Sequence, residues 1–121
     1  MPTAPRAFRA PRGTAELASH DGACRAGIYR ELGLDERSAD LMRLVDCVGL
    51  GYAQSTDDEL RYIVEVARAT GVCLDPVYSG KAALGMAADL AARPCGACLF
   101  IHTGGLLGLY AKTAQLAPIL A

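Results

Sequence analysis

The stretch that decides the fold prediction is CLFIHTGGL, residues 98–106. It opens with the apolar run Cys98–Ile101, which is too short for a helix and typical of a buried strand. Gly104 and Gly105 follow, and we expect an apolar helix from Leu106 to about Leu116. Ligands of open α/β sheets bind beyond the carboxyl ends of the strands, so this junction is a candidate binding site. A tight turn without a ligand is an equally good explanation of the two glycines.

The preceding stretch, VCLDPVYSGKA at residues 72–82, has the same order of elements. Its apolar run Val72–Leu74 is expected to be a buried strand that Asp75-Pro76 ends, and a helix is predicted from about Gly80 to Ala91. Tyr78, Ser79 and Lys81 lie between the two. These residues suit proton transfer or binding of a carboxylate. The alternative is a plain helix N-terminus with Ser79 as its cap and Lys81 in solvent.

A further helix is predicted upstream, where Thr56 and Glu59 have the spacing of a capping box and Gly71 is a helix stop. The resulting order of helix, strand, helix, strand, glycine-rich loop and helix is typical of α/β proteins with parallel strands. Wholly apolar strands imply a sheet covered on both faces. We therefore predict an α/β fold that holds part of a three-layer parallel sheet, with its remaining strands elsewhere.

Cysteine spacing offers a different hypothesis, because Cys95 and Cys98 form a C-x-x-C motif. Such a pair can be a redox site or half of a zinc site. His20 and His102 do not have the spacing of the two missing zinc ligands, and the pair precedes a strand rather than a helix. We interpret the two cysteines as incidental and expect no metal. His102 is expected to be held by a hydrogen bond beneath the glycine-rich loop.

Composition limits the class of protein further. The 121 residues carry a formal net charge of −1, which gives no electrostatic footprint for nucleic acid. No apolar stretch approaches the roughly 18 residues needed to cross a bilayer. Residues 1–21 are predicted to be a disordered or unrelated segment, and their basic, acid-free start is typical of a transit peptide or of a flexible tail. We expect an intracellular protein, either cytoplasmic or mitochondrial.

Three segments, taken together, carry a resemblance to a known family: GLGYA at 49–53, LDPVYSGKA at 74–82 and FIHTGGL at 100–106. In order and spacing they resemble the C-terminal region of D-cysteine desulfhydrases and of the related 1-aminocyclopropane-1-carboxylate deaminases. The resemblance is strong over about residues 47–116 and looser over 22–46. It implies that residues 22–121 are the C-terminal part of the large domain of the tryptophan-synthase-β-like fold, which is fold type II of pyridoxal-phosphate enzymes.

The resemblance also implies the site. Tyr52 and Tyr78 match two active-site tyrosines with catalytic and substrate-binding roles, and Thr103, Gly104 and Gly105 match the loop beside the pyridine ring of pyridoxal phosphate. Ser79 matches a substrate-binding position. The deaminases usually carry an acidic residue where Ser79 stands and a leucine where Thr103 stands, whereas desulfhydrases carry small hydroxyl residues at both.

The implied reaction is α,β-elimination, in which D-cysteine and water give pyruvate, ammonia and hydrogen sulfide, with pyridoxal phosphate as the electron sink. The Asn-Lys motif and the phosphate-binding loop of the family have no match here, so we expect no activity from the chain alone. Expected partners are a small D-cysteine-like amino acid, and either another copy of the chain or a full-length homologue. The alternative function is that of a non-catalytic remnant, which would associate with a full-length homologue.

Overall fold

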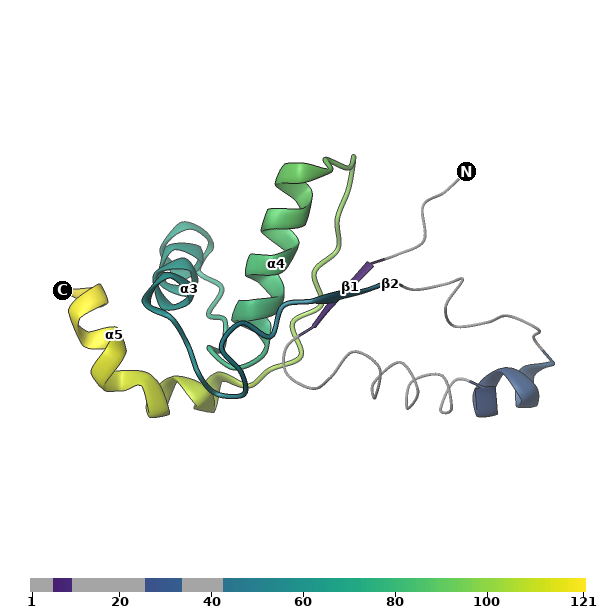
Figure 1. The fold of residues 1–121 in the computed structure, drawn as a ribbon, viewed down its shortest axis with the longest axis horizontal. Coiled ribbons are helices and arrows are strands. Elements are labelled where there is room, and N and C mark those ends of the chain that lie inside the picture. The colour runs from purple at the N-terminus through teal and green to yellow at the C-terminus, as the bar shows by residue number, and fades with distance from the viewer. Residues whose placement is uncertain (1–5, 10–25, 34–42) are drawn as a thin grey trace.

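The computed structural model describes residues 6–9, 26–33 and 43–121. Residues 26–32 are helical, and Gly33 follows with a left-handed φ of 67°. The other elements, drawn in Figure 1, are β1 (Arg6–Arg9), β2 (Arg43–Asp46), α3 (Asp57–Thr70), α4 (Ser79–Ala92), the 3₁₀ helix η1 (Leu106–Lys112) and α5 (Thr113–Leu120).

Helix α3 begins and ends as its sequence predicts. The Glu59 amide donates to the Thr56 hydroxyl at 3.1 Å, and the Thr56 amide donates to the Glu59 carboxylate at 2.9 Å. This reciprocal capping box satisfies two amides that the first helical turn leaves without partners. At the other end Gly71 adopts a left-handed φ of 76°, a conformation that glycine reaches without strain.

The core is built around the apolar face of α3, which packs against both α4 and α5. Leu60 is completely buried, and Ile63 and Val64 lie beside it on the same face. The remaining buried apolar side chains of the cluster come from the segment after α3, from α4 and from α5: Leu74, Ala83 and Leu116. Helical periodicity in α3 therefore determines where the core lies.

The sheet differs from the prediction. The described residues contain one two-stranded parallel sheet, in which Arg6 of β1 lies opposite Arg43 of β2 and Arg9 opposite Asp46. In Figure 1 this pair runs beside α4. Four residues of the predicted disordered or unrelated segment 1–21 thus form a strand. The other residues of that segment lie outside the described ranges, and the division into 1–21 and 22–121 stays a prediction.

The two predicted buried strands, Val72–Leu74 and Cys98–Ile101, are not strands among the described residues, so the expected partial three-layer sheet is not confirmed. Leu99 is 84% exposed and Ile101 is 72% exposed. A strand is stabilised by hydrogen bonds to neighbouring strands and by layers that cover its faces. Within residues 43–121 nothing supplies such neighbours, so apolar composition alone does not make these segments strands.

The last predicted helix, Leu106 to about Leu116, is two elements. Gly105 enters it with a left-handed φ of 93°, and its carbonyl accepts from the Gly108 amide at 2.9 Å, the i to i+3 bond of a 3₁₀ helix. Gly108 in the first turn weakens the α-helix, which begins only at Thr113. No helix in the described part of the chain is long and apolar enough to span a membrane.

Candidate active site

Asp75 organises the segment between Leu74 and α4. Its side chain is completely buried, and its carboxylate accepts from the amides of Val77 at 2.8 Å, Tyr78 at 2.7 Å and Ser79 at 2.7 Å. The Ser79 hydroxyl donates to the same carboxylate at 2.5 Å. One acid therefore fixes the backbone that carries Tyr78, at the N-terminus of α4, where the helix dipole also favours a negative charge.

Two opposing effects set the pKa of the Asp75 carboxyl. Burial raises it, because the charged form loses water. The hydrogen bonds from the Ser79 hydroxyl and from the amides of Ser79, Tyr78 and Val77 favour the charged form, and the balance leaves the pKa below its ordinary value. Asp75 is therefore an ionised structural anchor at neutral pH.

The glycine-rich loop meets this anchor. A side chain at Gly105 would place its Cβ 2.9 Å from Asp75 Cγ, so only glycine allows the loop to lie this close. His102 holds the loop from below. Its Nε2 lies 2.8 Å from the Cys73 carbonyl, and its Nδ1 accepts from the Gly104 amide at 3.0 Å. The prediction of a structural histidine under the loop is confirmed.

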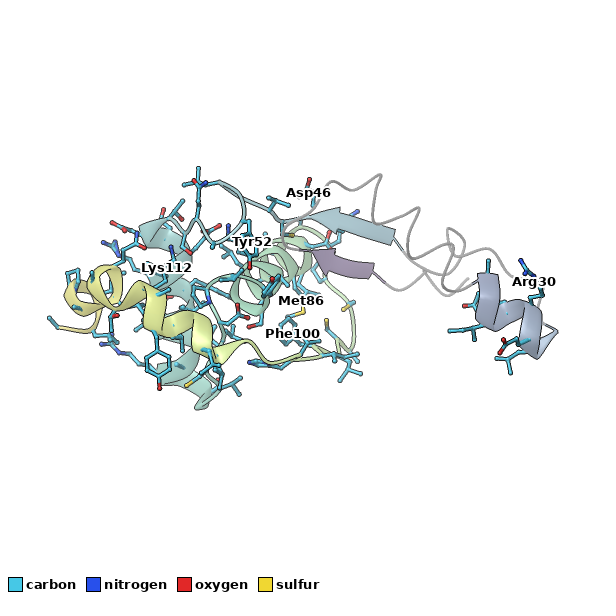
Figure 2. The ribbon with its side chains drawn as sticks, turned by 90° about the horizontal axis from the view of Figure 1, so that it is seen from below. Arg30, Asp46, Tyr52, Met86, Phe100 and Lys112 are labelled. Carbon is cyan, nitrogen blue, oxygen red and sulfur yellow. The ribbon has the colours of Figure 1, made fainter. Side chains whose placement is uncertain are left out.

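Tyr52 and Tyr78 come together in space. Their hydroxyl oxygens are 3.5 Å apart, and their ring centroids are separated by 6.1 Å with the planes tilted by 59°. The two side chains remain 64% and 45% exposed. Figure 2 labels Tyr52 where its loop approaches α4. The structure thus brings two phenols together at a place that a ligand from solvent can reach.

The other predicted site residues are placed as follows. Thr103 is exposed, and Gly104 and Gly105 follow it in the loop that lies against Asp75. Ser79 is buried, and its hydroxyl both donates to the Asp75 carboxylate and accepts from the Asp75 amide at 2.8 Å. Its predicted contact with substrate stays a prediction, and here its hydroxyl faces the anchor.

Sequence reasoning missed the role of Lys81, for which it offered catalysis or solvent. The side chain is 1% exposed, and its ammonium donates to the carbonyls of Val48 at 2.7 Å, Gly51 at 3.0 Å and Gln54 at 2.6 Å. These three residues belong to the loop that carries Tyr52. Backbone carbonyls leave no mark in a sequence, so no residue pattern pointed to this contact.

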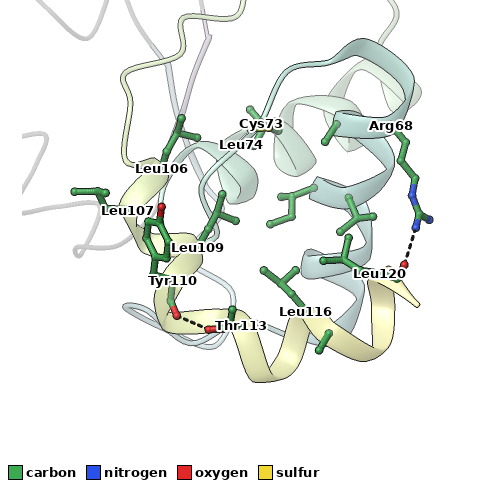
Figure 3. Close-up of a pocket in the computed structure, with 14 residues that line it drawn as sticks. Arg68, Cys73, Leu74, Leu106, Leu107, Leu109, Tyr110, Thr113, Leu116 and Leu120 are labelled. Atoms are coloured by element: carbon green, nitrogen blue, oxygen red, sulfur yellow. Dashed lines mark hydrogen bonds between the residues drawn. The ribbon is translucent and has the colours of Figure 1, made fainter.

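A separate apolar groove lies among α3, η1 and α5, with a volume of about 850 Å³ (Figure 3). Leu106, Leu107 and Tyr110 of η1 form part of its wall, and Leu116 and Leu120 of α5 form another. None of the predicted site residues lines it. The groove is therefore distinct from the tyrosine pair.

The C-x-x-C pair does not gather metal ligands. The Cys95 thiol donates to the Ala97 carbonyl at 3.2 Å, and the Cys98 thiol lies 3.4 Å from the Met86 sulfur. Both cysteines are exposed and not joined in a disulfide. Among the residues that the structure describes, no three histidine, cysteine or acidic side chains are grouped to hold a metal ion.

Comparison with known proteins adds the family. The chain is 45% identical over 98 residues to the mitochondrial bifunctional D-cysteine desulfhydrase/1-aminocyclopropane-1-carboxylate deaminase of Arabidopsis thaliana, an alignment that covers 78% of this chain and 24% of that protein. A Thermotoga maritima protein with the provisional name 1-aminocyclopropane-1-carboxylate deaminase is 41% identical over 71 residues, which cover 59% of this chain and 22% of that protein. No protein-family model matches the chain.

The chain is therefore homologous to part of two proteins that are named as a desulfhydrase/deaminase and as a deaminase. Its sequence is similar to part of D-cysteine desulfhydrases and 1-aminocyclopropane-1-carboxylate deaminases, as its three motifs predict. It spans about a quarter of the length of these relatives. That coverage agrees with the prediction that it corresponds to their C-terminal portion.

Proposed function

We propose that this chain forms the tyrosine-bearing wall of the active site of a pyridoxal-phosphate-dependent D-cysteine desulfhydrase and is inactive alone. The observation that carries the proposal is the approach of the Tyr52 and Tyr78 hydroxyls to 3.5 Å at an exposed place. A phenol so placed can move a proton or bind a substrate carboxylate. The whole protein would convert D-cysteine and water to pyruvate, ammonia and hydrogen sulfide inside the cell.

The residues of this chain divide the work in the proposed site. Tyr52 and Tyr78 contact the substrate, with Ser79 beside them at the start of α4. Thr103, Gly104 and Gly105 would bind the cofactor on the side of its ring. The anchoring of both segments on Asp75 supports this assignment, because one buried carboxylate holds the Tyr78 backbone and touches the glycine-rich loop.

The lysines of this chain do not fit a covalent attachment of pyridoxal phosphate. Lys81 and Lys112 are the only lysines in the sequence. A Schiff base needs an accessible, deprotonated amine. The Lys81 ammonium is buried and saturated by three carbonyls, and Lys112 ends η1, outside the segments that meet at Asp75. We therefore propose that the anchoring lysine belongs to another part of the whole protein.

The purified 121-residue chain tests this proposal directly. It would be mixed with pyridoxal phosphate, dialysed, and assayed for the absorbance band of a Schiff base and for pyruvate release from D-cysteine. We expect neither signal. A band that survives dialysis together with pyruvate release would show that Lys81 or Lys112 anchors the cofactor, and the proposal would be wrong.

A chimeric enzyme tests the same site within a complete protein. In it, the aligned residues of this chain replace the aligned part of the Arabidopsis relative. The chimera supplies the anchoring lysine that the isolated chain does not offer, and it is the background for the active-site variants discussed below.

The second candidate function is that of a non-catalytic partner of a full-length homologue or of another copy of itself. The exposed Leu99 and Ile101 and the groove of η1 and α5 favour it, since exposed apolar surface of this kind is typical of interaction sites. Co-purification of the tagged chain with the full-length Arabidopsis relative would support this function. A chain that stays monomeric and does not co-purify would exclude it.

A further inference from the structure

The loop of residues 48–54, which carries Tyr52, has weak internal bonding. Within it the Gly51 amide donates to the Val48 carbonyl at 3.3 Å, and the Gln54 amide donates to the Gly51 carbonyl at 3.4 Å. Three of its residues, Gly49, Gly51 and Ala53, have positive φ angles of 60°, 126° and 55°. Long hydrogen bonds and left-handed conformations hold a loop poorly by themselves. Its conformation needs support from outside.

Lys81 supplies that support from the first turn of α4. An ammonium has three N–H donors, and here each meets one carbonyl of the loop, at 2.6 to 3.0 Å. The acceptors point at one buried cation, in the way that main-chain oxygens surround a bound metal ion. Because burying an ammonium is costly unless it is fully hydrogen-bonded, the loop and the lysine stabilise each other.

Glu59 connects this cation to α3. One of its carboxylate oxygens closes the capping box with the Thr56 amide, and the other lies 3.7 Å from the Lys81 nitrogen. Gly49 makes the close packing possible, since a Cβ there would lie 2.5 Å from the Glu59 carboxylate and 3.3 Å from the Lys81 nitrogen. The start of α3, the loop and the start of α4 therefore meet at one ammonium group.

We propose that Lys81 is a positioning residue, an internal cation that fixes the 48–54 loop and so holds Tyr52 beside Tyr78. The two tyrosines are attached to the two sides of this contact: Tyr52 lies in the loop, and Tyr78 immediately precedes α4. The catalytic meaning rests on the proposed function. The positioning itself needs no cofactor or substrate, so it can be tested even if the proposed reaction is wrong.

The test compares Lys81→Met with Lys112→Met in the 121-residue chain. Nuclear Overhauser effects between the ring protons of Tyr52 and Tyr78 report their proximity, and hydrogen exchange of the Leu60 and Ile63 amides reports the folding of α3. We expect Lys81→Met to lose the ring-to-ring effect and to keep the α3 protection. We expect Lys112→Met to keep both. Retention of the ring-to-ring effect in Lys81→Met would overturn the proposal.

If Lys81→Met fails to fold, the unmodified chain can still be used to test whether Lys81 is a buried cation bound to the loop. Reductive methylation should modify Lys81 at least about tenfold more slowly than Lys112, because Lys81 becomes accessible only when the structure opens locally. The Lys81 ammonium protons should also show Overhauser effects to the α-protons of the 48–54 loop. Methylation of both lysines at the same rate, without those effects, would contradict the proposed internal cation.

Discussion

The hydroxyl of Tyr78 lies 3.5 Å from the hydroxyl of Tyr52, although 26 positions separate the two residues in the sequence. Local secondary structure does not bring the two residues together. Asp75 fixes the backbone of Tyr78, and Lys81 binds the loop that presents Tyr52. The pair is thus the product of two buried charged groups on either side of the N-terminus of α4.

Removal of either hydroxyl should impair the chimeric enzyme. Tyr78→Phe and Tyr52→Phe are expected to lower kcat/KM for D-cysteine by about 100-fold to 10,000-fold, the range of a lost proton-transfer group. Tyr110→Phe is the control, because Tyr110 lines the apolar groove instead. Steady-state pyruvate formation measures all three. Equal activity of Tyr78→Phe and Tyr110→Phe would remove Tyr78 from the proposed site.

Loss of the Asp75 charge should destabilise the chain. Asp75→Asn replaces an acceptor oxygen by an amide group that faces backbone donors, and we expect a loss of about 1–3 kcal/mol in the free energy of unfolding. Urea denaturation measures it. The exposed Asp58→Asn serves as the comparison, and a similar small loss for both variants would contradict the anchoring role of Asp75.

The stability of the chain should also depend on pH through Asp75. Its folded-state pKa lies below the ordinary value of 3.8, so the unfolded chain binds this proton more tightly. The stabilisation is present above 3.8 and is lost as the pH falls from there through the lower folded-state pKa. Urea titrations across the acid range should show this loss in the unmodified chain and not in Asp75→Asn.

The close approach of the glycine-rich loop gives a third test of the anchor. Gly105→Ala should cost about 1–3 kcal/mol in unfolding free energy, because the new methyl group meets Asp75 and the residue has a positive φ. Gly96→Ala is the matched control, since a methyl group there would have no neighbouring atom within 4 Å. Thermal denaturation of the two variants should separate them clearly, and identical midpoints would mean that the loop does not contact Asp75.

Exposed apolar side chains should make the isolated chain associate with itself. We expect sedimentation velocity to show concentration-dependent association, and the double variant Leu99→Ser, Ile101→Ser to reduce it, since both side chains lie largely in solvent. The pair Ala91→Ser, Ala92→Ser, at the exposed end of α4, is a control for adding polar groups. If both double variants associate as the parent does, these residues are not part of an interface.

Sequence alone predicted those parts of the fold that depend on local chemistry. The Thr56–Glu59 capping box and the glycine stop after α3 follow from residue types at fixed spacing, and both formed. The apolar runs at 72–74 and 98–101 do not form the predicted strands among the described residues, because a strand depends on neighbours that its own sequence does not specify.

The candidate site divides in the same way. The three motifs located Tyr52, Tyr78 and the glycine-rich loop, and the structure brings the two tyrosines together. The role of Asp75 had a readable signal, because aspartate before a turn often accepts from the amides that follow it. The role of Lys81 had none, since its partners are backbone carbonyls of a distant loop.

The most direct test of the central claim is pyruvate formation from D-cysteine by the chimeric enzyme loaded with pyridoxal phosphate. If this chain carries the tyrosine wall of a desulfhydrase site, the chimera should form pyruvate, and Tyr78→Phe should abolish most of that activity. A folded chimera that binds pyridoxal phosphate but forms no pyruvate from D-cysteine would contradict the account.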